Sequence, residues 1–411
     1  MKKIKLPQKA WFGDGELEIY FPPAWDVTIH DIPADKLPVI SIDDLSRAIN
    51  KPIGCEPLSV LARNRNEVAI IFDDLSRPTP VDKVLPLLLD ELHSAGISDD
   101  KIRFIVALGA HGAHTRSEFE KKLGTEIIKR YPVYNHNPYE NCIYMGTTKQ
   151  GTRVEINSEV AKCDLKIGIG SILPHPMNGF GGGGKIILPG IASMDSIEAN
   201  HLLSSKKDDF PNKSWMGSLE SNFMRRDLEE AASIAGLDFK IDLFVNSSRE
   251  IVGMVTGDHI KAYNKGIEKA YSLYNTVKKE AMDVVIVNAN AKINEAFIAA
   301  QLVASCVKKG GTLVLIVDSP IGQVCHYLLG PFGKKMGGRM HSSPYHLFEH
   351  LERVIILSQY PDYASGQWIA PHEKINWADS WDQVVNMLEE NSNKTMHVSV
   401  YVDGTMQFFK E

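Results

Sequence analysis

Short apolar runs alternate with segments of helical periodicity along most of this chain. Four runs in the first half have the length and turn boundaries of strands, at 67–74, 101–109, 142–148 and 164–172. The segments 80–96 and 114–131 between them repeat apolar residues at helical spacing. Because strands and helices that alternate in this way form layers of helix on sheet, the sequence predicts an α/β fold.

The second half of the chain repeats the pattern after a different connection. Residues 239–258 have the pattern of a hairpin that turns at Ser247 and Ser248, and residues 258–280 that of a long linking helix. Strand patterns then recur at 282–290, 310–319 and 353–359, with helix patterns at 293–309 and 381–390. We therefore predict two α/β domains, residues 1–270 and residues 271–411.

The composition argues against several classes of function. The chain has 411 residues, 44% of them hydrophobic, which is enough for two buried cores. A formal net charge of −6 argues against a nucleic-acid partner or an acidic membrane surface. Five cysteines without a C-x-x-C pair suggest neither a disulfide framework nor a thiolate metal site. Since no segment has the pattern of a secretory signal or a membrane span, we predict a cytoplasmic protein with small-molecule partners.

The segment with the clearest chemical content is a glycine-rich turn flanked by histidines. It contains Gly181, Gly182, Gly183, Gly184 and Lys185, with His175 before the turn and His201 after it. Glycines have no side chains, so the backbone of such a turn can approach a flat or phosphorylated ligand closely. We therefore predict that this segment binds a cofactor, with one amine and two imidazoles around it.

Two other interpretations of the glycines remain open. Residues 179–185 satisfy the first seven positions of the phosphate-loop pattern G-x-x-x-x-G-K-[ST], which would place Lys185 on a nucleotide phosphate. Ile186 stands where the magnesium-binding hydroxyl should be, and residues 174–178 separate the loop from its strand. The second interpretation is a tight turn that only joins a strand to a helix.

Polar residues follow the first two predicted strands, where open α/β sheets bind ligands. Asp74 and Arg77 come after the first strand and His111 after the second. The planar guanidinium of Arg77 suits a substrate carboxylate, and Asp74 suits the orientation of a histidine or a cofactor group. Alternatively, Asp74 caps a helix and pairs with Arg77. Asp73 is a further acid to which we assign no role.

Three segments in this order, 73–80, 107–115 and 175–201, resemble the nickel-pincer lactate racemase family, and the similarity runs over almost the whole chain. The resemblance implies a racemase or epimerase of a 2-hydroxy acid, with its active site in the cleft between the two domains. It also implies a nickel-pincer nucleotide, the nickel complex of pyridinium-3-thioamide-5-thiocarboxylic acid mononucleotide, which dedicated maturation enzymes must build.

The resemblance also implies the roles of individual residues. Lys185 would hold the cofactor through a thioamide, and His201 would complete the nickel coordination, the cofactor supplying the other donors. His111 and His175 would form the acid–base pair, one for each face of the substrate, because an imidazole titrates near neutral pH. On residue type alone, His201 is also explained as a helix-end histidine, and His111 and His175 as hydrogen-bonded structural histidines.

This chain departs from the family pattern at two places. Where lactate racemases carry Gln and Lys three residues apart after an aromatic residue, this chain has Ile298 and Gln301 after Phe297. Beside the first base, His111 is followed by His114 in place of an adjacent basic residue. We therefore predict that these residues contact a substrate that is either lactate-like or a larger hydroxy acid or sugar acid. A phosphate-loop transferase and a non-catalytic binding relative remain the alternatives.

Overall fold

The computed structural model describes residues 2–205, 215–329, 348–366, 369–390 and 395–409. The chain divides into two compact units, an inserted unit of Leu37–Ser272 and a terminal unit of Met1–Lys36 with Leu273–Glu411. The sequence-based prediction assigned residues 1–36 to the N-terminal domain. They belong instead with the C-terminal part, because strand β3 (Trp25–His30) pairs along its whole length with β19 (Met396–Tyr401).

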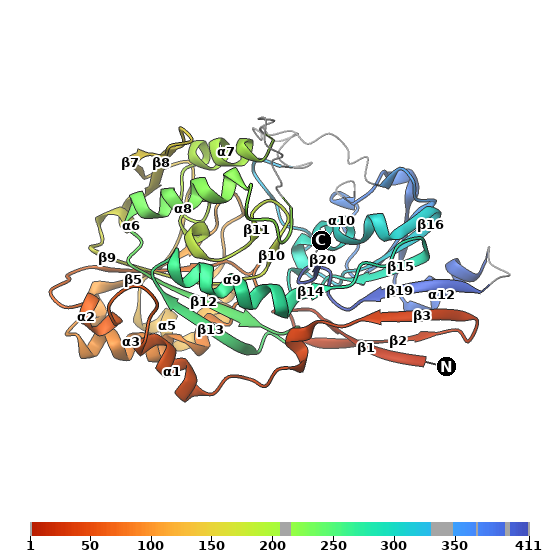
Figure 1. The fold of residues 1–411 in the computed structure, drawn as a ribbon, viewed down its shortest axis with the longest axis horizontal. Coiled ribbons are helices and arrows are strands. Elements are labelled where there is room, and N and C mark those ends of the chain that lie inside the picture. The colour runs from red at the N-terminus through yellow and green to blue at the C-terminus, as the bar shows by residue number, and fades with distance from the viewer. Residues whose placement is uncertain (1, 206–214, 330–347, 367–368, 391–394, 410–411) are drawn as a thin grey trace. The chain divides into compact units, whose positions relative to one another are not determined.

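The inserted unit is built on a six-stranded sheet with the order β13-β12-β9-β4-β5-β6. Figure 1 labels β13, β12, β9 and β5 of this sheet. Its strands are β4 (Val68–Asp73), β5 (Ile102–Ala107), β6 (Val133–Asn135), β9 (Leu165–Ser171), β12 (Phe239–Val245) and β13 (Ile251–Gly257). Neighbouring strands are parallel except for the β12–β13 hairpin at one edge. Every residue of β4, β9 and β12 is buried, as expected for strands covered on both faces.

The strand order places a topological switch point between β4 and β9. From β4 the chain adds β5 and β6 on one side, and it then returns to add β9 and β12 on the other side. The loops after β4 and β9 therefore leave the sheet side by side at its carboxyl edge, where open α/β sheets bind ligands. These two loops carry the DLSR and glycine segments that the sequence singled out.

Helices of the inserted unit begin and end at residues that explain their limits. They are α1 (Ile42–Asn50), α2 (Leu58–Leu61), α3 (Leu85–Ser94), α4 (Arg116–Leu123), α5 (Thr125–Arg130), α6 (Ser158–Lys162), α7 (Met194–Leu202), α8 (Phe223–Ala235) and α9 (Lys261–Tyr274). Thr115 and Glu118 form a capping box at the start of α4. Gly124, with φ of 83°, divides the single helix predicted at 114–131 into α4 and α5.

One predicted strand lies outside the main sheet of the inserted unit. The run at 142–148 forms β7 (Cys142–Thr147), which pairs with β8 (Arg153–Asn157) in a separate antiparallel hairpin. Most of β7 is half-buried or exposed, unlike the strands of the parallel sheet. The apolar run alone did not distinguish a covering hairpin from a sheet strand.

The terminal unit contains a six-stranded parallel sheet with the order β18-β17-β16-β15-β19-β3. The strands not yet given are β15 (Met282–Asn288), β16 (Val307–Ile316), β17 (Arg353–Leu357) and β18 (Ile375–Ala378). A hairpin of β1 (Lys2–Gln8) and β2 (Gly15–Phe21) and helix α12 (Trp381–Glu389) share one apolar core with this sheet. A short parallel pair joins β14 (Asn275–Thr276) to β20 (Phe408–Phe409).

The helix predicted at 293–309 is shorter in the structure. Helix α10 (Phe297–Val303) is followed by a 3₁₀ turn, and Val307 already begins β16. Within the described residues, no helix has the length and apolar character to cross a membrane. The cytoplasmic location stays a prediction.

Candidate active site

A carboxylate and an imidazole meet where the loops after β4 and β5 converge. The Asp74 Oδ2 lies 2.6 Å from the His111 Nδ1, and the Asp74 Oδ1 accepts a hydrogen bond from the Ser76 backbone N–H at 3.1 Å. Burial would raise the pKa of the Asp74 carboxyl, but the charges of His111 and Arg77 and the bond from His111 hold it well below its usual range. An ionised carboxylate only accepts, so His111 Nδ1 carries a proton, and in the neutral form of the ring the lone pair is on Nε2.

Arg77 closes the turn that begins at Asp74. Its backbone N–H donates to the Asp74 carbonyl at 3.1 Å, and its Nη1 donates to the carbonyl and hydroxyl oxygens of Ser76, each at 2.9 Å. The guanidinium is therefore oriented by its own loop. Its predicted contact with a substrate carboxylate stays a prediction.

His114 supports the same loop from the inside. Its Nε2 accepts a hydrogen bond from the Leu75 backbone N–H at 3.0 Å, and its own backbone N–H donates to the Asn135 Oδ1 at 2.9 Å. Burial lowers the pKa of the His114 imidazole, which keeps the ring neutral and able to accept. These bonds are by themselves a structural reason for a histidine at this position. The predicted contact of His114 with a substrate stays a prediction.

His175 lies in a short hairpin after β9, formed by β10 (Pro174–His175) and β11 (Gly179–Phe180). Its Nδ1 accepts hydrogen bonds from the backbone N–H groups of Met177 and Asn178, each at 3.2 Å. Backbone N–H groups only donate, so the neutral ring carries its proton on Nε2. His175 is therefore fixed in the opposite tautomer to His111, with an Nε2 that donates rather than accepts.

The glycine loop is held by buried charged groups of the inserted unit. The Asp242 Oδ2 on β12 accepts a hydrogen bond from the Gly183 N–H at 2.8 Å, and the Arg225 Nη1 on α8 donates to the Gly182 carbonyl at 3.1 Å. The Arg225 side chain is 4% exposed and stacks on the Tyr263 ring, 3.6 Å from its centroid. Lys185 follows on the four-residue 3₁₀ turn η4 (Gly183–Ile186).

The structure gives the glycines a packing reason that the sequence did not reveal. A Cβ atom on Gly182 would lie 2.9 Å from the Asp242 Oδ1, and one on Gly184 would lie 2.9 Å from the Ala232 Cβ. A Cβ on Gly183 would overlap the Arg225 Nη2. The missing side chains of these three residues thus make room for the protein itself. Close approach of the loop, Gly181 included, to a cofactor stays a prediction.

The phosphate-loop interpretation does not fit this geometry. A phosphate loop joins its strand directly to a helix whose N-terminus faces the phosphate. Here the β10–β11 hairpin separates β9 from the glycines, and the lysine lies on a 3₁₀ turn of four residues. Without a helix after the glycines, the loop has no helix N-terminus to offer a nucleotide.

His201, near the end of α7, is a buried neutral imidazole. Its Nδ1–H donates to the Ile197 carbonyl at 2.8 Å, which leaves the lone pair on Nε2. Burial lowers the pKa of His201 to about 4, and the charges of Lys185 and His111 act in the same direction. His201 is therefore a neutral nitrogen donor at physiological pH, within electrostatic reach of Lys185 and His111.

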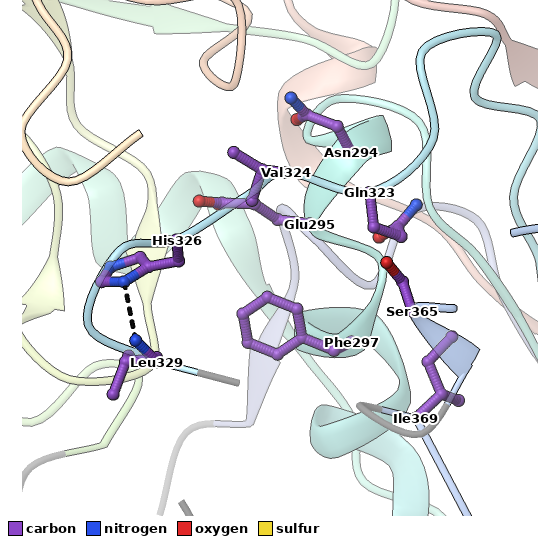
Figure 2. Close-up of a pocket in the computed structure, with 9 residues that line it drawn as sticks. All are labelled: Asn294, Glu295, Phe297, Gln323, Val324, His326, Leu329, Ser365 and Ile369. Atoms are coloured by element: carbon purple, nitrogen blue, oxygen red, sulfur yellow. Dashed lines mark hydrogen bonds between the residues drawn. The ribbon is translucent and has the colours of Figure 1, made fainter. Parts of the chain in front are cut away.

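The predicted substrate contacts Ile298 and Gln301 lie on α10 of the terminal unit. Both side chains are buried. A pocket opens at the start of this helix, and Figure 2 shows the Phe297 ring among its other side chains. It is lined by Asn294, Glu295, Phe297, Gln323, Val324, His326, Leu329, Ser365 and Ile369, and so by neither of the two predicted residues.

The side chains near His201 determine how a metal ion could be bound at this site. Among the residues that the structure describes, no group of three or more His, Cys, Asp and Glu side chains could hold a metal ion. As a neutral imidazole, His201 could supply one donor to a metal, and the amine of Lys185 could hold an organic group that brings further donors.

Comparison with known proteins assigns the family. Residues 12–211 match the lactate racemase N-terminal domain. A lactate racemase from Thermoanaerobacterium thermosaccharolyticum is 32% identical over 287 residues, which cover 68% of this chain and 66% of the relative. A lactate racemase from Lactiplantibacillus plantarum is 30% identical over 288 residues with the same coverage. The chain belongs to the lactate racemase family. The matched region spans slightly less than two thirds of these relatives.

Solved structures agree with this assignment. The lactate racemase apoprotein from Thermoanaerobacterium thermosaccharolyticum has a TM-score of 0.77 and 25% identity, with all of both chains covered. A Thermotoga maritima protein has a TM-score of 0.63 and 16% identity, with 90% of this chain and 98% of that chain covered, and shows the fold alone. The predicted α/β fold and the predicted family are thereby confirmed.

Sequence reasoning missed the charged residues that support the site. Lys122 lies beneath the DLSR loop, and Arg225 and Asp242 hold the glycine loop. One signal was present in the strand FKIDLFV, which carries Lys240 and Asp242 in an otherwise apolar run. Paired charges in a buried strand indicate a structural or functional site, since burial of an unpaired charge is costly.

Proposed function

We propose that this chain is an isomerase that racemises or epimerises a 2-hydroxy acid with the help of a nickel-pincer nucleotide bound through Lys185. The observation that carries the proposal is the set of groups around the β4–β9 switch point. The Asp74–His111 pair, His175 and the Lys185 loop all follow carboxyl ends of neighbouring strands, and His201 is a neutral donor near Lys185. Family membership supports the same activity.

The two histidines suit the proton transfers of this reaction. His111 offers a lone pair on Nε2, so it can accept the proton of the substrate hydroxyl group. His175 offers an N–H on Nε2, so it can donate a hydrogen bond to the oxygen of the substrate and of the keto acid. The proton that His111 takes from the hydroxyl group would return from the His111 imidazolium to the same oxygen when hydride returns to the carbon, so both histidines end a turnover in the states in which they began.

The remaining groups would bind and orient. When bound, the nickel-pincer nucleotide supplies a hydride acceptor for the carbinol carbon. Lys185 would hold it covalently and the His201 Nε2 would coordinate the nickel, while Arg77 would bind the substrate carboxylate through its planar guanidinium. Cofactor loading makes the maturation enzymes obligatory partners in this proposal.

The test is the intact mass of the protein after co-expression with cofactor maturation enzymes, followed by peptide mapping. We expect a nickel-containing adduct on the peptide that carries Lys185, and no adduct in a Lys185→Ala variant. Lys83, which is exposed and paired with Asp82, serves as a matched lysine whose peptide stays unmodified. An unmodified Lys185 peptide, under conditions that load a lactate racemase, would contradict the proposal.

We also propose that α10 tunes substrate choice and that this chain prefers a hydroxy acid larger than lactate. Ile298→Gln with Gln301→Lys would restore the polar and cationic side chains of the family pattern. Because a charge-assisted hydrogen bond contributes about 1.5–3 kcal/mol, kcat/KM for lactate should rise roughly 10–100-fold. Chiral chromatography of lactate and of a panel of sugar acids would measure it. An unchanged preference in a folded, loaded double variant would exclude this role of α10.

A further inference from the structure

A buried lysine beneath the DLSR loop donates hydrogen bonds to two carbonyl groups of that loop. Lys122, on α4, is fully buried. Its Nζ donates to the Asp74 carbonyl at 3.0 Å and to the Arg77 carbonyl at 2.9 Å, and it lies 2.8 Å from the Asp73 Oδ1. Two of its N–H donors thus bind carbonyls of the DLSR loop, and its charge is paired with the Asp73 carboxylate.

The same ion pair connects the loop to the neighbouring strand. The Asp73 carboxylate lies within hydrogen-bonding distance of the Thr79 hydroxyl, which is 2.9 Å from the Ser171 hydroxyl at the end of β9. Lys122 therefore binds the turn between Asp74 and Arg77 directly. It is connected to the end of β9 through Asp73 and Thr79. The turn and the end of β9 both lie at the switch point.

The carbonyls that Lys122 binds belong to residues with chemical roles. The Asp74 side chain fixes the tautomer of His111, and Arg77 carries the guanidinium proposed for the substrate carboxylate. A carbonyl that moves takes its own side chain with it, since both are attached to one Cα. Burial of a charge costs free energy, so a lysine at this position indicates a specific need for its two carbonyl hydrogen bonds and its ion pair.

We infer that Lys122 is a positioning residue of the active site, which holds the Asp74–His111 pair and the Arg77 guanidinium in place through their backbone carbonyls. Its importance for turnover rests on the function proposed above. The geometry of the Asp74–His111 hydrogen bond, by contrast, can be measured without any cofactor. The two statements can therefore fail separately.

The experiment uses proton NMR of the full chain without cofactor. A short imidazole–carboxylate hydrogen bond gives the His111 Nδ1 proton a low-field resonance, identified by its absence in His111→Gln. Because Lys122→Met alone leaves Asp73 buried without its cation, the informative variant is Asp73→Asn with Lys122→Met. Asp73→Asn alone retains both carbonyl bonds of Lys122.

The matched control is Lys166→Met. Lys166 is also buried, and its Nζ donates to the Cys163 carbonyl at 2.7 Å at the start of β9, the opposite end of that strand from Ser171. We expect the resonance in wild type, Asp73→Asn and Lys166→Met, and its loss or shift in the folded Asp73→Asn/Lys122→Met protein. In the loaded enzyme that double variant should lower kcat/KM about 10–100-fold and displace the pH profile.

Two outcomes would overturn the inference. One is a folded double variant that keeps both the low-field resonance and the wild-type kcat/KM. The other is equal loss of the resonance in Lys166→Met, which would show that it reports stability rather than position. If the resonance depends on Lys122 while loaded wild-type protein turns over no hydroxy acid, the positioning role stands and the proposed function fails.

Discussion

Replacement of His111 or of His175 by Ala is expected to lower the racemisation rate by roughly 10²–10⁴-fold, the usual contribution of a general acid or base. His111→Ala removes the group that takes up and returns the hydroxyl proton, and His175→Ala removes the hydrogen-bond donor to the same oxygen, so each variant impairs both directions of the reaction. The measurement is initial rates in both directions by chiral chromatography, on protein whose Lys185 adduct has been verified by mass.

The control for this prediction is His93→Gln. His93 lies on α3, its side chain is 32% exposed, and its ring is 2.9 Å from the Asp99 carboxylate, a pairing similar to that of His111 with Asp74. This variant should keep the wild-type rate. If loaded His111→Ala and His175→Ala proteins racemised as fast as wild type, the two histidines would be structural. If wild type itself had no activity, the chain would be a non-catalytic binding relative.

The sequence predicted where the candidate site lies better than it predicted the strand order and the hydrogen bonds that form the site. The ends of β4, β5 and β9 were placed to within one or two residues, because buried parallel strands are near-continuous apolar runs. The positions of Asp74, His111 and the glycine loop at one sheet edge followed from those strands. The switch point between β4 and β9 depends on strand order, which local patterns do not contain.

The tautomers of the histidines also could not be predicted from sequence. They depend on single hydrogen bonds, to the Asp74 carboxylate for His111 and from two backbone N–H groups for His175. The place of residues 1–36 was missed for a similar reason. Strand β3 pairs with β19, and residues so far apart in the sequence leave no local signal.

The glycine loop shows how one pattern can have two physical causes. From the sequence, consecutive glycines suggested a backbone open to a ligand. In the structure, the Cβ positions of Gly182, Gly183 and Gly184 face Asp242, Arg225 and helix α8. Tight packing of the loop and presentation of Lys185 are compatible, since a rigid support holds a reactive amine in one place. The loop should therefore be sensitive to the addition of a single methyl group.

Gly183→Ala is expected to lower the free energy of unfolding of the inserted unit by about 2–4 kcal/mol. The residue has φ of 57°, a left-handed conformation that costs an alanine about 1 kcal/mol. The added methyl group would also overlap the Arg225 Nη2 and lie 3.0 Å from the Tyr263 ring, which adds the cost of overpacking. Urea denaturation of the unloaded protein, followed by circular dichroism, measures the change.

Gly151→Ala separates the two contributions to this loss. Gly151 lies between β7 and β8 of the same unit with φ of 90°, and no atom lies within 4 Å of its Cβ position. This variant should lose only about 1 kcal/mol, the cost of backbone strain alone. The excess in Gly183→Ala then measures the contact with Arg225 and Tyr263. Equal losses of unfolding free energy in the two variants would mean that the loop can shift to accommodate the methyl group. The contact with Arg225 would then not fix the position of the loop.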